Sequence, residues 1–188
     1  MPRAAFLALL VLPLLAASAA GQHLQPYAGL QTRTVKALSG EQIADLRAGR
    51  GMGLALAAEL NGYPGPSHVL ELANDLGLTP AQRERTQTLF DAMKAEAMPL
   101  GEAMIAAEND LDRQFASRTV TPASLTAATE AIGAAQARVR AAHLKYHLAM
   151  LELLTPDQVK RYGELRGYGS GAPVSHNPAM HQHKPNMK

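Results

Sequence analysis

Two long runs of apolar residues, spaced by alternating steps of three and four, constrain this chain more than any other feature. The first run is Leu89, Met93, Ala97, Leu100, Met104, Ala107, Leu111 and Phe115. The second run is Leu125, Ala128, Ile132, Ala135, Val139, Ala142, Tyr146, Ala149 and Leu153. These steps match the period of an α-helix, and no segment shows a convincing strand pattern. We therefore expect an all-α fold, built on a long antiparallel helical hairpin with shorter flanking helices.

Capping residues mark where these helices begin. A Thr-Pro pair stands before each of three helical segments, at Thr79, Thr121 and Thr155. The threonine hydroxyl caps the helix, and proline at the first helical position loses an N–H that would be unpaired anyway. Pro99 should kink the first long helix without ending it, because the apolar seam continues in register on both sides.

The segment before the hairpin predicts two further helices. Ser39 begins a capping box with Gln42, and apolar residues then continue at helical spacing to a stop at Asn61 and Gly62. We expect one helix across this stretch, weakened in its middle by glycines at positions 49, 51 and 53. A short helix containing Val69 should follow and end at Gly77.

The two ends of the chain have the composition of segments outside the folded core. Residues 1–20 combine Arg3, an apolar run and small residues, as a secretory signal does, so we expect a periplasmic protein. The run is shorter than the ~20 residues that span a bilayer, so a retained anchor is the lesser alternative. The expected division is a signal at 1–20, a loose lead at 21–38, a helical domain at 39–168 and a disordered tail at 169–188.

Composition excludes several classes of protein. The chain has no cysteine, which rules out disulfides, thiolate metal sites and a lipoprotein anchor. Its net charge is +2 with no basic block, which gives little support to nucleic-acid binding. No phosphate-binding glycine motif and no catalytic constellation is evident, so we do not expect an enzyme, and no cofactor is required.

Two stretches of the chain are near copies of each other. Residues 78–82 read Leu-Thr-Pro-Ala-Gln and residues 154–158 read Leu-Thr-Pro-Asp-Gln. Considered alone, each is a good helix start with a capping box, and two such starts can arise independently. The motif residues are Leu78, Thr79, Gln82, Leu154, Thr155 and Gln158.

The paired motifs resemble the LTxxQ motifs of the Spy/CpxP superfamily, and the resemblance extends over roughly residues 39–168. That superfamily includes periplasmic chaperones and metal-responsive proteins. The resemblance implies a curved, usually dimeric helical cradle. It also implies either binding of unfolded or misfolded envelope proteins or metal-linked stress sensing, with a sensor kinase as a candidate partner. Pro99, in the middle of the long helix, departs from the expected pattern.

A chaperone needs apolar surface that is exposed on a stable frame. A second apolar stripe on the last long helix lies outside the hairpin seam, and methionines on the first long helix are adaptable enough for varied contacts. The candidate client-binding residues are Leu144, Leu148, Leu151, Met93, Met98 and Met104. The alternative is that these side chains pack in the core or in a dimer interface.

Three groups of residues are candidate metal ligands. His143 and His147 are four residues apart on one helix face, with Met150 on the same edge. The tail contributes a second group, which consists of His176, Met180, His181, His183 and Met187. His23 is the third, because cleavage after Ala20 would place it third in a square-planar copper or nickel site. The alternative for the first group is a pair of solvated or hydrogen-bonded histidines on a helix flank. For the tail it is a polar, low-complexity end. For His23 it is cleavage after Ala19 or Gly21, which would destroy the site.

These observations predict an ATP-independent, chaperone-like envelope-stress protein that binds unfolded clients through apolar helix surface. The alternative is a periplasmic protein for binding, sensing or resisting copper, nickel or zinc. A homodimer is expected, with no membrane span in the mature chain and no nucleic-acid partner.

Overall fold

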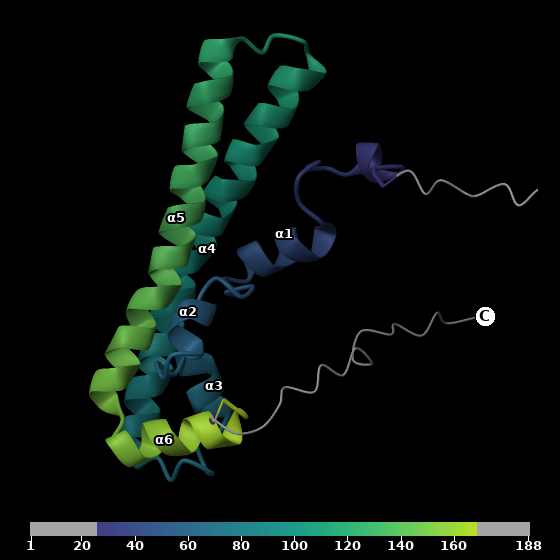
Figure 1. Cartoon of the computed structure of the whole chain (residues 1–188). Coiled ribbons are helices and arrows are strands. Elements are labelled where there is room, and N and C mark those ends of the chain that lie inside the picture. The colour runs from purple at the N-terminus through teal and green to yellow at the C-terminus, as the bar shows by residue number, and fades with distance from the viewer. Residues whose placement is uncertain (1–25, 169–188) are drawn as a thin grey trace, which may run out of the picture.

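The computed structural model describes residues 26–168, and within that range the chain contains helices and no strand (Figure 1). A 3-10 turn, η1, spans Leu30–Thr32. The helices are α1 (Gly40–Arg47), α2 (Leu56–Glu59), α3 (Pro66–Glu71), α4 (Pro80–Ala116), α5 (Pro122–Leu153) and α6 (Pro156–Leu165). The all-α prediction is confirmed. None of these helices is apolar over a length that would cross a membrane.

Helices α4 and α5 form the predicted hairpin, and they lie side by side and antiparallel in Figure 1. Thr121 caps α5 in a capping box with Ser124. The far end of the hairpin is covered by no other described helix. The seam there is consequently less buried than its pattern suggests, and Phe115 is 54% exposed.

Helix α4 continues through Pro99, as the uninterrupted seam predicts. Two residues further on, Gly101 is buried beneath α1. A Cβ atom at this position would lie 2.4 Å from the backbone oxygen of Leu46. The absence of a side chain at Gly101 therefore lets α1 approach the backbone of α4 closely.

The prediction of one helix from Ser39 to Gly62 is wrong. The Ser39 cap is confirmed, but the helix ends at Arg47 and a loop separates α1 from α2. In that loop Gly49, Met52 and Gly53 have positive φ angles of 66°, 45° and 78°. Three left-handed residues within five positions break the helix, where the sequence pattern predicted only a weakening.

The expected loose lead also needs correction in its second half. Val35 and Leu38 are buried in a cluster with Leu46, Met104 and Ile105, among others. These contacts hold residues 35–38 against α1 and α4. The first lead residues (21–25), the candidate signal (1–20) and the tail (169–188) lie outside the described residues.

Candidate functional site

The two LTxxQ motifs meet at the base of the hairpin. The Gln82 Nε2 donates to the Gln158 Oε1 over 2.8 Å, and the Gln158 Nε2 donates back to the Gln82 Oε1 over 3.0 Å. Each glutamine oxygen also completes a capping box. The Gln82 Oε1 accepts from the backbone N–H of Thr79, and the Gln158 Oε1 accepts from that of Thr155. The motifs are thus joined to each other as well as capping two helices.

Each glutamine amide also holds a more distant backbone carbonyl. Gln82 donates to the oxygen of Leu153 over 3.1 Å, and Gln158 donates to the oxygen of Leu76 over 3.3 Å. These carbonyls lie at the end of α5 and just after α3, where the chain enters α6 and α4. Leu78 and Leu154 are buried in the same core cluster. The motif pair therefore fixes the base of the hairpin against α3 and α6.

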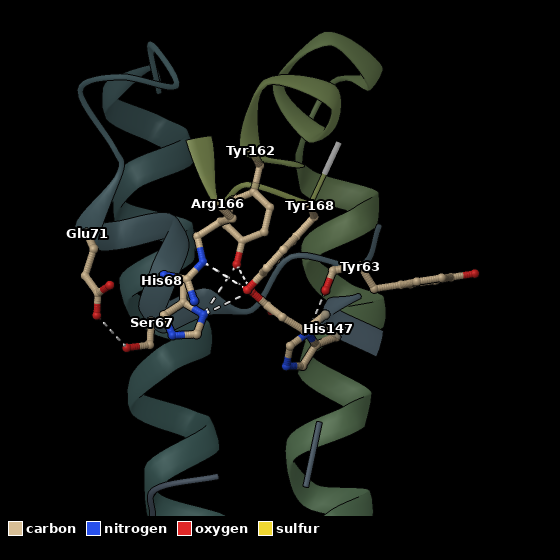
Figure 2. A network of polar contacts seen from close by, with 9 residues as sticks. Tyr63, Ser67, His68, Glu71, His147, Tyr162, Arg166 and Tyr168 are labelled. Atoms are coloured by element: carbon tan, nitrogen blue, oxygen red, sulfur yellow. Dashed lines mark hydrogen bonds and ion pairs between the residues drawn. The ribbon is translucent and has the colours of Figure 1, made fainter. Parts of the chain in front are cut away.

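Directly above this base, α2 ends in the buried carboxylate of Glu59, which is only 5% exposed. Tyr162 and Tyr168 donate their hydroxyls to its Oε1, the latter over 3.3 Å. The Nδ1 of His68 lies 3.1 Å from the same oxygen, and the Nε of Arg166 lies 3.7 Å away. Figure 2 shows these side chains converging from α3, α6 and the residues that follow α6.

The second carboxylate oxygen of Glu59, Oε2, is buried without a hydrogen-bond donor among the residues of the described range. The Nδ1 of His147 lies 3.7 Å from it, but this nitrogen donates to the carbonyl of Tyr63 over 2.7 Å. Buried carboxylate oxygens are costly to leave unpaired, so this one calls for an explanation.

Hydrogen bonds keep Glu59 ionised despite its burial. Burial alone would raise the pKa of this carboxyl, but the hydrogen bonds from His68 and Tyr162 outweigh it and lower the pKa. The charge of a protonated His68 or His147 acts in the same direction. Conversely, burial and the bond to Glu59 raise the pKa of Tyr162. The tyrosine stays a donor and the glutamate stays an anion.

A cavity of about 500 Å³ opens beside Glu59, between the α1–α2 loop, α3, α4 and α5. Gly65 contributes to its wall, and a Cβ there would lie 2.8 Å from the Cε1 of His147. This glycine lets the backbone contact the imidazole closely. The side chains on the wall that carry atoms able to bind a metal ion include Glu59, His68, His143, His147, Met52 and Met93.

The predicted pair on α5 lies on this wall, but both ring nitrogens of His143 and the Nδ1 of His147 face backbone carbonyls. His143 places its Nδ1 2.8 Å from the oxygen of Val139 and its Nε2 3.2 Å from that of Gly49. Met150 is fully buried in the core cluster at the base. Within residues 26–168, no three His, Cys, Asp or Glu side chains are already positioned to share one ion.

His23 and the tail residues His176, Met180, His181 and His183 lie outside the described residues.

The candidate client-binding residues divide into two groups. Met93 and Met104 are buried, so they offer no surface to a client. Leu148, Leu151 and Met98 are exposed, and Leu144 is half-buried.

Sequence reasoning missed Glu59 and the side chains that hold it, namely His68, Tyr162, Arg166 and Tyr168. One signal was available, because Glu59 is the only charged residue, histidine aside, between Arg50 and Glu71. A lone carboxylate in an apolar stretch of that length is a candidate for burial with partners.

A family model described as heavy-metal resistance matches residues 52–161, which include most of the cavity wall, the hairpin and both LTxxQ motifs. Among curated proteins and among solved structures, none matches the chain.

Proposed function

Since the chain belongs to the heavy-metal resistance family, a Spy/CpxP-like family of periplasmic helical proteins, we propose that it binds a heavy-metal cation in the cavity beside Glu59. The observation that carries this proposal is the Oε2 of Glu59, which is buried, anionic and without a donor. A cation would satisfy this oxygen and offset the charge of the carboxylate.

The donor set suits copper, nickel or zinc. Carboxylate and imidazole are ligands that these ions accept. The Nε2 of His147 has no hydrogen-bond partner in the described range, and its ring lines the cavity together with that of His68. Figure 2 shows the two rings on opposite sides of the space between α4 and α5. Because no three ligands are already in place, ion binding would have to draw these side chains together.

In this proposal the ion is the protein's cargo. A protein exported by the signal at residues 1–20 would lower the free metal concentration in the periplasm by holding the ion. The tail histidines and His23 would then be additional, independent ligands. No reaction is required of the protein, and we propose that it is not an enzyme.

The test uses the full chain with His23, His176, His181 and His183 replaced by alanine, so that only the cavity histidines remain. Calorimetric titration with Cu(II), Ni(II) and Zn(II) should show binding in this background. Adding Glu59→Gln or His147→Ala should weaken it by at least about tenfold, or about 1.4 kcal/mol, because each removes a ligand. Chelator-treated protein serves as the starting state.

The matched control for this experiment is Glu108→Gln. Glu108 is a half-buried carboxyl on α4 whose pKa burial raises, and it does not line the cavity. It should leave metal affinity unchanged. If Glu59→Gln and His147→Ala bind every ion as tightly as the background, the cavity is not the site and the proposal fails.

A specific observation favours a second function, which is the binding of unfolded chains. Leu148 is 57% exposed, and Leu144 and Leu151 flank it at steps of four and three along α5. Apolar side chains exposed at this spacing form a continuous strip that an unfolded segment can contact without ATP.

The same strip is proposed as the homodimer interface. Two copies of α5, antiparallel and centred between residues 137 and 138, would place Leu148 of one copy against Ala127 of the other. Both residues are exposed. Lys145 already pairs with Glu96 of α4 in the same chain, so apolar contact would hold the two copies together.

One double variant, Leu148→Ser with Leu151→Ser, tests this surface. In the presence of chelator, it should suppress client aggregation about twofold less than the wild type in a light-scattering assay, because the apolar strip is lost. It should also sediment as a monomer. Leu125→Ser, at the exposed far end of the hairpin, is the control. Unchanged suppression and unchanged sedimentation would remove both roles from α5.

A further inference from the structure

Two methionines share the cavity wall with the imidazoles, and they arrive from different parts of the chain. Met93 comes from α4 and is 6% exposed. Met52 comes from the glycine loop between α1 and α2 and is 38% exposed. One thioether thus lies in the interior of the protein and the other lies toward solvent.

Met93 is not an ordinary core methionine. Two other buried methionines, Met104 and Met150, each belong to one of the two hydrophobic core clusters. Met93 is equally buried but belongs to neither cluster. Its side chain faces the cavity, in company with His143 and His147.

Met52 is held in an unfavourable backbone conformation. Its φ is 45°, in the left-handed region, which is unfavourable for a residue with a side chain and favours glycine. Its neighbours in the chain are Gly51 and Gly53. Glycine is the residue that such a left-handed bend prefers, and it stands on both sides of Met52. Strained residues of this kind cluster at ligand-binding sites.

We propose that the thioethers of Met52 and Met93 make the cavity selective for a soft monovalent cation, Cu(I) or Ag(I), over Zn(II). This inference rests on the proposed function, since it requires that the cavity binds metal. Thioether sulfur is a soft ligand that favours Cu(I), whereas Zn(II) is held by imidazole, carboxylate and thiolate.

The wall combines the ligands that this selectivity needs. Imidazole from His68 or His147 binds both kinds of ion, so it provides affinity without discrimination. The thioethers add affinity for the soft ion alone. The single negative charge of Glu59 balances the charge of a monovalent cation. The ion binds as Cu(I) or Ag(I), so no oxidation or reduction accompanies binding.

The test replaces each methionine with leucine in the full chain that lacks His23 and the tail histidines. Leucine conserves volume and apolar character, so these changes should alter stability little, as a urea titration will check. Cu(I) affinity is measured anaerobically with ascorbate by competition with bicinchoninate, and Zn(II) affinity by calorimetry. The controls are Met98→Leu, on the surface, and Met104→Leu, in the core.

Met52→Leu with Met93→Leu should weaken Cu(I) binding by at least about tenfold and leave Zn(II) binding within about twofold. The two controls should change neither. Unchanged Cu(I) affinity, or an equal loss for both ions, would overturn the inference. In either case Glu59→Gln still decides the proposed function separately, because loss of all metal binding in that variant would leave the cavity as the site.

Discussion

Replacing Gly101 with alanine should destabilise the protein by about 3 kcal/mol, because the added Cβ would collide with the backbone of α1. The new atom would lie 2.4 Å from the oxygen of Leu46, 2.9 Å from its carbonyl carbon and 3.1 Å from its Cβ. Backbone atoms cannot rotate out of the way as the end of a flexible side chain can. Helix α1 would have to move off α4, which would expose the core cluster of Val35, Leu38 and Leu46.

Gly133 on α5 provides the matched control. It is also a helical glycine, but a Cβ there has no atom within 4 Å. Gly133→Ala should therefore stabilise the protein by about 0.5–1 kcal/mol, through helix propensity alone. Urea unfolding followed by circular dichroism measures both variants. If Gly101→Ala leaves the midpoint unchanged or raises it, as is expected of Gly133→Ala, the close contact between α1 and α4 is wrong.

The long helices could be predicted because the signals that specify them lie in residues close together in the sequence. Steps of three and four along residues 89–115 and 125–153 are visible in the chain itself, and so are the caps at Thr79, Thr121 and Thr155. The pairing of the two motifs was only half predictable. The capping role of each glutamine follows from its spacing, but the amide-to-amide contact depends on how α4 and α6 are placed in space.

The break between α1 and α2 shows where local reasoning failed. Helix propensity alone assigns the glycines at positions 49, 51 and 53 a small destabilising effect each, which predicts a weakened helix. In the structure, two of them and Met52 adopt left-handed conformations together. The loop they form carries Met52 to the cavity wall and lets Gly49 accept a hydrogen bond from His143.

The Glu59 site was missed because its contacts join residues far apart in the chain. Tyr162 follows Glu59 by 103 positions, and Tyr168 follows it by 109. No periodic pattern links them, and the sequence does not show which partner a buried tyrosine hydroxyl will find. The histidine pair on α5 was found by its spacing, yet the carboxylate beside it became evident only in the folded structure.

Replacing Tyr162 with phenylalanine should lower the free energy of unfolding by about 2–3 kcal/mol at neutral pH. The hydroxyl donates to a buried carboxylate, and hydrogen bonds to charged groups contribute about 1.5–3 kcal/mol. Phenylalanine keeps the packing in the basal core cluster, so the loss reports the hydrogen bond. The control is Tyr146→Phe. The hydroxyl of Tyr146 donates to Glu96, a half-exposed carboxylate on α4. Its cost should stay below about 0.5 kcal/mol, as for surface pairs.

The free energies of unfolding of the wild type and of Tyr162→Phe should differ less in acid than at neutral pH. This direction follows from the lowered pKa of Glu59. A carboxyl whose pKa is lower in the folded state adds stability above its unfolded value of 4.5, and that stability is lost as the pH falls through the folded pKa. Removing the Tyr162 donor raises the folded pKa, so the variant has less of this stability to lose. Urea unfolding in chelator, from about pH 7 to about pH 3, should show the two curves converging. A difference in free energy of unfolding that stays constant over that range would mean that Glu59 is not the buried anion on which the metal proposal depends.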